Sequence, residues 1–331
     1  MTDTMRAIVL DEPGPVTNLH LRHLPIPEPR PGWVRIKVEA FGLNRSELHT
    51  RLGYAGDAVT YPRILGIEAT GTIDTDPTGT YQPGQQVMTL TGGMGRSFDG
   101  GYAEYTTVPV SQVIPFHSTL DWATLGAVPV MLQTAYGSLT IGLDAQPGQT
   151  LLVRGGTSSV GMAAAILAKR HGMTVLSTTR DPSKTDTLTR IGVDHVLIDD
   201  GTIAGQVRAT VPEGVDGAIE LVGTPTLPDT LRATRVHGTV CFIGMLSNEW
   251  IVKDFYPIDY LPRGVRLTAY TGGSADLPAT VLQGYLDDVA AGAATVPVDR
   301  VFDLDRVRDA HQLMEDGTAR GKLVVRTTRN T

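Results

Sequence analysis

The chain has 331 residues, of which 41% are apolar and 19% charged, and its formal net charge is −7. This length favours two domains, and the composition is that of an ordinary globular protein. The negative charge argues against a general affinity for nucleic acid or an anionic membrane, and the single cysteine, Cys241, excludes an internal disulfide and a four-cysteine zinc site.

The first residues, MTDTMRAIVLDEPGP, carry charges too early for a signal peptide. No apolar run approaches the ~20 residues that a membrane-spanning helix needs. We therefore expect a protein that does not enter the membrane and works in the reducing cytoplasm, with Cys241 as a small buried residue of a strand.

Residues 1–120 contain short β-like runs separated by Gly and Pro, such as RAIVL, WVRIKVEAFGL, QQVMTL and GYAEYTTVP. The alternation of apolar and polar residues in VRIKVEA is typical of a half-buried antiparallel strand. This part of the chain is predicted to form a compact β-barrel or sandwich.

Residues 121–265 alternate helical runs such as MAAAILAKRHG with apolar strands such as TLLVRG, TVLSTT and TVCFIG. Strands that alternate with helices predict βαβ units and a parallel sheet. Residues 266–331 add two helices and a closing strand, GKLVVR. We expect them to rejoin the first domain, which makes that domain discontinuous (1–120 and 266–331).

The stretch LLVRGGTSSVG, residues 151–161, runs from a strand through a tight turn into a helix, which is the order that a dinucleotide phosphate site requires. Gly156 and Gly161 fit the outer positions of G-x-G-x-x-G, but Ser158 replaces the middle glycine. Serine is small enough to leave the approach open, and its hydroxyl can donate to phosphate. The alternative is a plain tight turn of an α/β protein.

The next strand, TVLSTT, ends in Thr179 and Arg180, and Lys184 follows four residues later. An NAD-dependent fold places a carboxylate at the end of this strand to accept from the ribose hydroxyls. Here Thr179 fills that position, and hydroxyl and cationic groups suit a 2′-phosphate instead. The sequence thus favours NADPH over NADH, the alternative being an exposed loop with incidental charges.

In seven segments the chain resembles the medium-chain dehydrogenase/reductase superfamily, in particular its zinc-free quinone oxidoreductase branch. The segments are GLNRSELHTRLG, YPRILGIEATGTI, GGYAEYTTVP, PVMLQTAYGSL, SSVG, DPSKTDTLTRIGVDHVLID and GKLVV. The resemblance covers almost the whole chain. It implies a GroES-like β-barrel domain, a doubly wound Rossmann domain for NADPH, an active site in the cleft between them, and a homodimer.

The resemblance also implies roles for particular residues. Asn44 and Ser46 would lie beside the nicotinamide and its ribose, Thr134 and Tyr136 at the nicotinamide side, Gly156, Ser158, Ser159 and Val160 in the phosphate turn, Thr179, Arg180 and Lys184 at the 2′-phosphate, Val222, Gly223, Gly244 and Met245 along the adenosine and nicotinamide edges, and Lys322 near the cofactor. The glycines can equally serve as turn residues with positive φ. A family tyrosine near HVLIDDG is replaced here by Asp199 or Asp200.

Zinc-dependent relatives carry a cysteine and a histidine where this chain has Ser46 and Ile67. Glu68 keeps the family's glutamate and is interpreted as structural. Without zinc, oxidation of a plain alcohol lacks a group that stabilises alkoxide. Hydride addition to a quinone or to the C=C bond of an α,β-unsaturated carbonyl spreads the charge, so hydrogen-bond donors suffice. The alternatives are an enoyl-thioester reductase and a non-catalytic NADPH-binding protein with a structural or sensing role.

Tyr54 is the candidate acid, because relatives keep a tyrosine after a similar glycine, and its phenol can donate to the substrate carbonyl or protonate the α-carbon. The alternative is a loop aromatic without a catalytic role. Arg96, in LTGGMGRSFDGG, would favour an anionic substrate at the mouth of the site, the alternative being a solvated loop arginine. Trp250, Phe255, Tyr256 and Tyr260 would shape an apolar pocket or a dimer interface.

Overall fold

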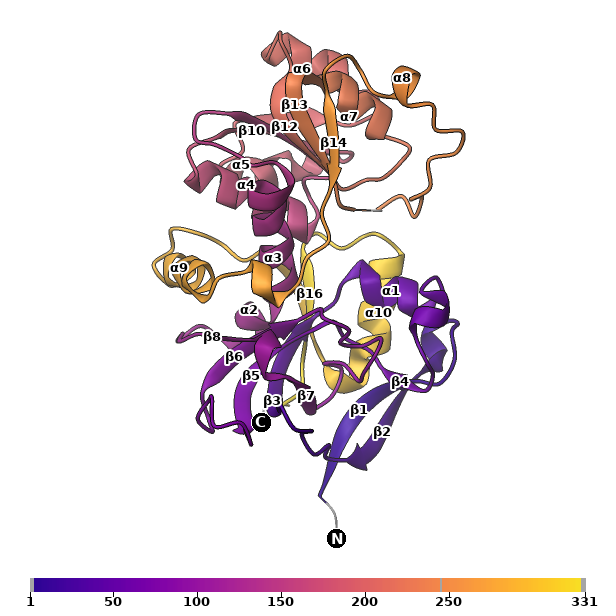
Figure 1. Cartoon of the computed structure of the whole chain (residues 1–331), viewed down its shortest axis with the longest axis vertical. Coiled ribbons are helices and arrows are strands. Elements are labelled where there is room, and N and C mark those ends of the chain that lie inside the picture. Colours follow the sequence, from indigo (N-terminus) through magenta and orange to yellow (C-terminus); the bar gives the residue numbers. More distant parts are fainter. Residues whose placement is uncertain (1–2, 245, 329–331) are drawn as a thin grey trace. The chain divides into compact units, whose positions relative to one another are not determined.

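The computed structural model describes residues 3–244 and 246–328. The chain divides into two compact units, which we call unit 1 (Met1–Gln133 with Gly273–Thr331) and unit 2 (Thr134–Gly272) (Figure 1). Unit 1 is discontinuous. These boundaries fall later in the chain than residues 120 and 265, where the sequence texture changes. Helix α2 (Trp122–Ala127) packs on the unit 1 strands, and β14 (Arg266–Ala269) pairs with a unit 2 strand.

Unit 1 is built mainly of antiparallel strands. In chain order its strands are β1 (Thr4–Leu10), β2 (Leu19–Pro25), β3 (Trp33–Gly42), β4 (Arg63–Ile64), β5 (Glu68–Thr75), β6 (Gln86–Leu90), β7 (Tyr105–Pro109), β8 (Val113–Pro115), β15 (Val298–Asp303) and β16 (Lys322–Arg326). Its helices are α1 (Arg45–Arg51), α2, α9 (Ala279–Ala290) and α10 (Val307–Glu315), with short 3₁₀ turns η1 (Val16–Asn18), η2 (Gly56–Ala58), η3 (Val110–Gln112), η6 (Ser274–Asp276) and η7 (Leu304–Arg306).

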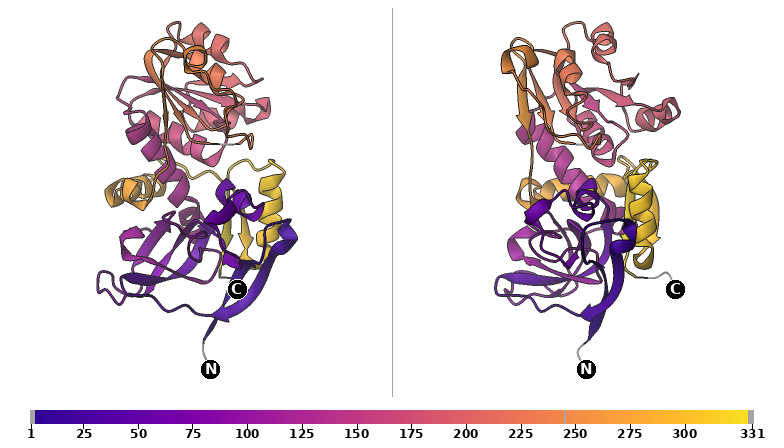
Figure 2. Two further views of the ribbon diagram at one scale, coloured as in Figure 1. Left: turned by 45° about the vertical axis from the view of Figure 1, so that its right-hand side comes forward. Right: turned by 90° about the vertical axis from the view of Figure 1, so that its right-hand side faces the viewer.

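Seven strands of unit 1 form one sheet in the order β15-β16-β3-β5-β6-β8, with β7 also paired to β3. The alternation in VRIKVEA places Val34, Ile36 and Val38 on the buried face of β3, each at most 1% exposed. A second sheet, β2-β1-β4, and α10 pack around the same core, and α10 lies along β16 (Figure 2). This is the GroES-like barrel that the sequence predicts.

Unit 2 is an α/β layer structure. Helix α3 (Pro129–Gly137) leads into it, followed by η4 (Ser138–Gly142), β9 (Thr150–Arg154), α4 (Ser159–Arg170), β10 (Thr174–Thr179), η5 (Pro182–Lys184), α5 (Thr185–Arg190), β11 (His195–Ile198), α6 (Ala204–Thr210), β12 (Val215–Glu220), α7 (Leu227–Ala233), β13 (Thr234–Phe242), α8 (Pro257–Tyr260) and β14. All adjacent strands of its six-stranded sheet are parallel, in the order β11-β10-β9-β12-β13-β14.

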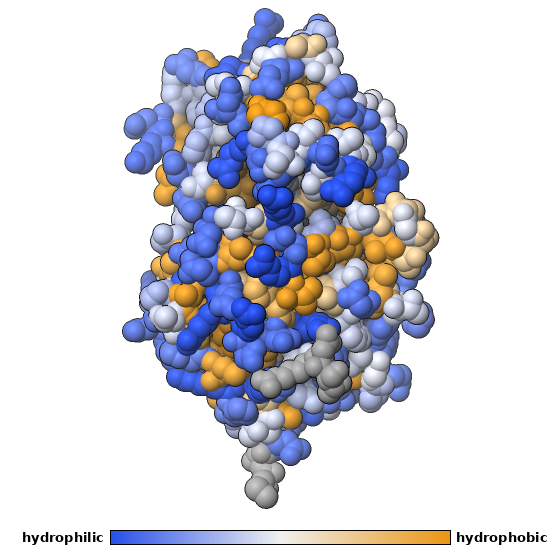
Figure 3. All heavy atoms as spheres, turned by 180° about the vertical axis from the view of Figure 1, so that it is seen from behind, coloured by the Kyte–Doolittle hydropathy of each residue, from blue (hydrophilic) through white to orange (hydrophobic). Residues whose placement is uncertain are grey.

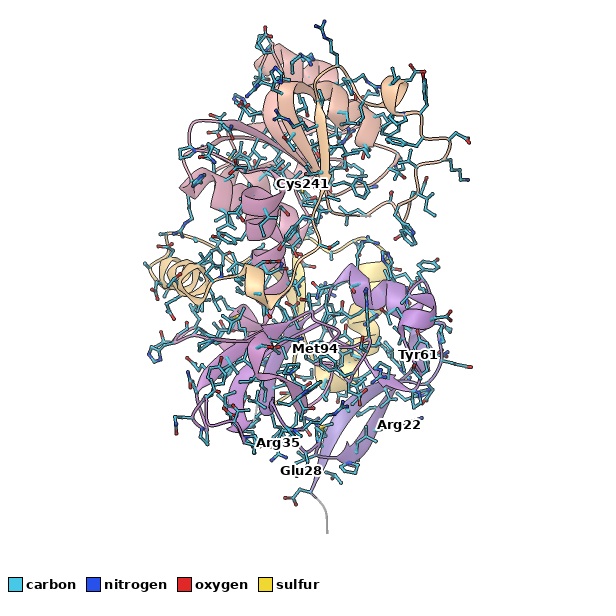
Figure 4. All side chains as sticks on the ribbon, in the orientation of Figure 1. Arg22, Glu28, Arg35, Tyr61, Met94 and Cys241 are labelled. Carbon is cyan, nitrogen blue, oxygen red and sulfur yellow. The ribbon has the colours of Figure 1, made fainter. Side chains whose placement is uncertain are left out.

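This strand order is that of a doubly wound Rossmann sheet, as predicted. The chain moves outward from β9 to β11 and then returns to place β12 beside β9. Ligands of such folds bind beyond the carboxyl ends of the strands at this switch point. The β9–α4 turn lies there. Cys241 is fully buried on β13 and is labelled in Figure 4, in agreement with its predicted place in a strand.

Within residues 3–244 and 246–328, no helix has the length and apolar character needed to cross a bilayer. The face of the molecule in Figure 3 mixes hydrophilic side chains with separate apolar areas. Such a mixture is normal for the surface of a folded protein.

Candidate functional site

The glycine-rich turn between β9 and α4 is held against the end of β10. Gly155 N–H donates to Thr178 Oγ1 and Gly156 N–H to Thr178 O, each at 3.0 Å. Gly155 has a φ of +87°, which favours glycine. A Cβ at Gly156 would collide with Ser177 Oγ. The turn therefore needs glycine at both positions, of which sequence analysis singled out only Gly156.

Ser158 is the N-cap of α4. Its Oγ accepts from Gly161 N–H at 3.1 Å and donates to Gly155 O at 2.8 Å. The serine that replaces the middle glycine thus stabilises the turn and the helix start. Because its hydroxyl hydrogen already has an acceptor, Ser158 is better suited to shape the turn than to donate to a phosphate.

The start of α4 leaves main-chain donors unused. Ser159 and Val160 are its first two residues, and among the described residues none accepts a hydrogen bond from either N–H. These donors and the helix dipole make the N-terminus of this 12-residue helix suitable for an anion such as a pyrophosphate.

The end of β10 carries the residues predicted to recognise a 2′-phosphate. Thr179 is buried, and its Oγ1 donates to Asp181 O at 3.1 Å, so its hydroxyl shapes the local turn. Arg180 is exposed and Lys184 half-buried, and neither cationic group pairs with a described carboxylate. Two cations are therefore available here, whereas the hydroxyl of Thr179 is committed.

A buried ion-pair network lies directly before the glycine-rich turn, and it was not predicted from the sequence. Arg154, the last residue of β9, is fully buried, and its Nε and Nη2 donate to the two oxygens of Asp199 at 2.9 Å. Its Nη1 donates to Asp229 Oδ2 at 2.9 Å and to Thr230 Oγ1 at 3.1 Å. An arginine at the end of an apolar strand, LLVR, was the available signal. Asp199 is thus committed to Arg154.

Glu220 continues this network at the end of β12. Its Oε1 accepts from the N–H groups of Val222 at 2.7 Å and Gly223 at 3.1 Å, and Thr230 Oγ1 donates to its Oε2 at 2.5 Å. Burial raises the pKa of Glu220, although these hydrogen bonds and Arg154 oppose the shift. The N–H groups of Val222 and Gly223 thus order the strand end. Their predicted contact with a cofactor remains a prediction.

Gly244 follows β13, and a Cβ there would collide with Leu221 O, so only glycine fits. Met245 lies outside the described residues. Thr134 and Tyr136 lie half-buried on α3, two positions apart, and therefore point to different sides of that helix.

In unit 1 the structure brings together two predicted residues, Asn44 and Lys322, around Glu68. Lys322 Nζ lies 2.7 Å from Glu68 Oε1 and donates to Asn44 Oδ1 at 2.6 Å, and Asn44 Nδ2 donates to Glu68 Oε1 at 2.9 Å. Glu68 Oε2 accepts from Val130 N–H at 2.7 Å. A Cβ at Gly42 would collide with Lys322 Cε, so glycine makes room for the ion pair.

A second carboxyl borders this ion pair. Asn44 is the N-cap of α1, and its N–H donates to Glu47 Oε2 at 3.1 Å, while Ile67 N–H donates to Glu47 Oε1 at 3.0 Å. Burial raises the pKa of Glu47 to about 7, and the charge of Glu68 adds to the shift, whereas the hydrogen bond from Ile67 and the charge of Lys322 oppose it. Near neutral pH this carboxyl is therefore partly protonated.

Ser46, in the first turn of α1, accepts a hydrogen bond from Arg96 Nη2 at 2.6 Å. Neither Ser46 nor Ile67 offers a thiolate or an imidazole, and the Glu68 carboxylate is already bonded to three groups. No cluster of three or more His, Cys, Asp or Glu suited to a metal occurs among the described residues. The donor set therefore does not fit the zinc site of zinc-dependent relatives.

Tyr54 lies in the loop after α1, and its side chain is 57% exposed, with its ring beside that of His49 at a centroid distance of 5.9 Å. The residue as a whole is exposed, as a candidate acid requires, and its catalytic role remains a prediction. In unit 2, Phe255 packs on Tyr260, and Tyr256 is 56% exposed. The aromatic residues around α8 thus form a partly exposed group.

Comparison with known protein families supports the folds described for both units. Residues 30–118 match the family described as alcohol dehydrogenase GroES-like domain, and residues 191–325 match the family described as zinc-binding dehydrogenase. The chain belongs to the medium-chain dehydrogenase/reductase superfamily.

Individual relatives narrow this assignment. The chain is 26% identical to the human quinone oxidoreductase over 97% of both chains. It superposes with a TM-score of 0.87 on AibC, at 26% identity over 99% of this chain and 97% of the other. The TM-score is 0.85 with mycobacterial Rv1454c in complex with NADPH, at 25% identity over 98% and 100% of the two chains. Within the superfamily, the protein falls in the quinone oxidoreductase branch and is an oxidoreductase.

Proposed function

We propose that the protein is a zinc-independent reductase that transfers hydride from NADPH to a quinone or to the C=C bond of an α,β-unsaturated carbonyl compound. The observation that carries this proposal is that Ser46 and Glu68 are already hydrogen-bonded within the protein and therefore offer no site for a metal. Ser46 is bonded to Arg96, and Glu68 to Lys322, Asn44 and the main chain. Hydrogen-bond donors suit the reduction of a quinone or enone, because hydride addition spreads the developing charge over carbon and oxygen.

Unit 2 supplies groups that suit NADPH. The N–H groups of Ser159 and Val160, which have no acceptor among the described residues, would bind the pyrophosphate, and Arg180 and Lys184 the 2′-phosphate. The structure of Rv1454c, a structural relative, is a complex with NADPH. When bound, this cofactor supplies the hydride.

Unit 1 supplies the groups that would act on the substrate. The phenol of Tyr54, an exposed residue, would donate a hydrogen bond or a proton to the reduced substrate. Asn44, whose side chain is fixed by Lys322 and Glu68, would lie against the nicotinamide ring as a rigid wall. We further propose that the protein is cytoplasmic and forms a homodimer. Sedimentation of the purified protein tests the homodimeric state.

The test begins with fluorescence titrations of the purified protein with NADPH and NADH. Cofactor oxidation then follows against a benzoquinone, a naphthoquinone, a cyclic enone, crotonyl-CoA and a plain ketone. We expect tighter binding of NADPH and turnover of the quinones or the enone. Tyr54→Phe should lower turnover and leave NADPH affinity unchanged, since the phenol is remote in sequence and in role from the phosphate groups.

Each other outcome would indicate a different function for this protein. A preference for crotonyl-CoA indicates an enoyl-thioester reductase, and tight NADPH binding without turnover indicates a protein that only binds the cofactor. Tighter binding of NADH contradicts the role given to Arg180 and Lys184.

A further inference from the structure

Arg96 carries a positive charge that the described part of the chain does not neutralise. Its Nη2 donates to Ser46 Oγ at 2.6 Å, and no described carboxylate lies within ion-pair distance of its guanidinium. Its Nε is buried and has no hydrogen-bond partner among the described residues. Leaving this buried Nε–H unsatisfied costs free energy, and a ligand that accepts a hydrogen bond from the half-buried guanidinium would recover part of that cost.

The loop that carries Arg96, residues 91–101, is fixed to the segment before β5. Thr91 N–H donates to Ile67 O at 2.6 Å, and Gly101 N–H donates to Gly66 O at 3.1 Å. A Cβ at Gly95 would lie only 2.8 Å from Gly66 O, so the two segments touch through their main chains. Met94, labelled in Figure 4, is buried one residue before Gly95. Arg96 is therefore held by a packed loop, unlike a solvated surface arginine.

The charges next to α1 leave this cation uncompensated. Lys322 and Glu68 neutralise each other at 2.7 Å, and Glu47 is partly protonated near neutral pH. Ser46, which holds Arg96, lies two residues after Asn44, so the guanidinium stands at the same end of α1 as the Asn44 cluster. An oxygen anion placed here would meet net positive charge.

We propose that Arg96 is a catalytic residue whose guanidinium donates a hydrogen bond to the substrate oxygen on which negative charge develops during hydride transfer. This inference rests on the proposed function. Under this proposal, the guanidinium of Arg96 performs the electrostatic task that a metal ion performs in zinc-dependent relatives. The guanidinium is hydrogen-bonded to Ser46, which stands where those relatives have a cysteine.

In the reduction of an enone, a hydride from the reduced nicotinamide forms a C–H bond at the β-carbon. The C=C π electrons then form the enolate C=C bond, and the carbonyl π electrons become a lone pair on oxygen. Arg96 stabilises this oxyanion. A proton from Tyr54 or water then adds at the α-carbon, so the carbonyl is restored, the enone is reduced and the nicotinamide is oxidised.

The first test measures binding without turnover. The probe is 4-nitrophenol, whose anion absorbs visible light and resembles an enolate in charge and shape. We expect the parent protein to bind the anion and to lower the apparent pKa of the phenol. Arg96→Gln should weaken binding of the anion at least tenfold and abolish the pKa shift, while Arg96→Lys keeps part of both.

The matched control is Arg63→Gln, which changes the net charge equally. Arg63 contacts the same loop through Asp99 at 2.9 Å, but that carboxylate already neutralises it. Arg63→Gln should bind the anion as the parent does. Equal binding by Arg96→Gln and the parent overturns the proposal, and thermal unfolding of each variant excludes loss of the fold.

The second test uses whichever quinone or neutral enone the parent reduces. Arg96→Gln should lower kcat about 10²–10³-fold, the loss typical of an oxyanion donor, and enlarge the isotope effect of deuterated NADPH. If Arg96 instead only binds a carboxylate of the substrate, the variant raises KM for carboxylate-bearing enones alone, and that result overturns the proposal. Lack of any turnover by the parent contradicts the proposed function, whereas the nitrophenol titration still decides whether Arg96 binds an oxyanion.

Discussion

Each unit buries a cluster of paired charged side chains, and unit 1 also holds a half-buried arginine, Arg96, whose donors are only partly used. In unit 2, every guanidinium nitrogen of Arg154 donates to a protein group, with Asp199 and Asp229 at 2.9 Å. In unit 1, Lys322 and Glu68 are paired, but Arg96 keeps donors that no described residue accepts. We therefore expect the closed network to support structure, and we expect Arg96 to be able to bind a ligand.

The largest loss of stability is expected from Arg154→Met. Asp199, Asp229 and Glu220 would remain buried without their cation, which we expect to lower the free energy of unfolding by about 5 kcal/mol. Urea unfolding followed by circular dichroism measures the loss. The control is Arg235→Met, because the Arg235–Asp216 pair is partly exposed and should contribute about 1 kcal/mol or less. Equal losses in the two variants would contradict the structural role of the buried network.

The next largest effect is expected in unit 1. Lys322→Met leaves Glu68 buried without a cation and should lower the free energy of unfolding by about 3 kcal/mol. Glu68→Gln combined with Lys322→Met removes both charges and should recover part of that loss. The same urea experiment measures both variants. A double variant that is less stable than Lys322→Met would show that Glu68 contributes through more than its charge.

Unit 1 also buries two titratable groups, Glu47 and His311, which should make its stability depend on pH. Burial raises the pKa of Glu47 from 4.5 to about 7, so its contribution to stability is present below pH 4.5 and is lost as the pH rises through 7. Burial and the charge of Arg51 lower the pKa of His311 from 6.5 to about 3, so its contribution is present above pH 6.5 and is lost as the pH falls.

Between pH 4.5 and 6.5 these two dependences oppose each other. Relative to the parent, Glu47→Gln should make stability rise with pH by about 1.4 kcal/mol per unit, and His311→Gln should make it fall by a similar amount. Unfolding curves collected at half-unit steps test this. Parallel profiles for the parent and both variants would show that neither group titrates as its burial requires.

The smallest effect concerns the cations at the end of β10. Arg180→Ala with Lys184→Ala should weaken NADPH binding at least tenfold, about 1.4 kcal/mol, and leave NADH binding unchanged, since only NADPH carries the 2′-phosphate. Fluorescence titration measures both cofactors. Lys169→Ala is the control, because Lys169 is already paired with Asp194 at 2.7 Å. Equal weakening for both cofactors would contradict recognition of the 2′-phosphate.

The sequence alone determined both folds and the position of the glycine-rich turn between β9 and α4. Alternation in VRIKVEA defined β3, and the run from an apolar strand through glycines to an alanine-rich helix defined β9 and α4, because these patterns depend on neighbouring residues. The same holds for the two cations at the end of β10. The superfamily followed from several such segments in their correct order.

Only the tertiary structure showed which polar side chains meet. Lys322 and Asn44 are 278 residues apart in the chain, yet Lys322 Nζ lies 2.6 Å from Asn44 Oδ1. Arg96 likewise donates to Ser46, 50 residues away in the chain. Ser158 is a helix cap, and the hydroxyl of Thr179 closes a turn. Hydrogen bonds and ion pairs act over about 3 Å, so packing of distant segments, and not local pattern, decides which donors are used and which remain free for a ligand.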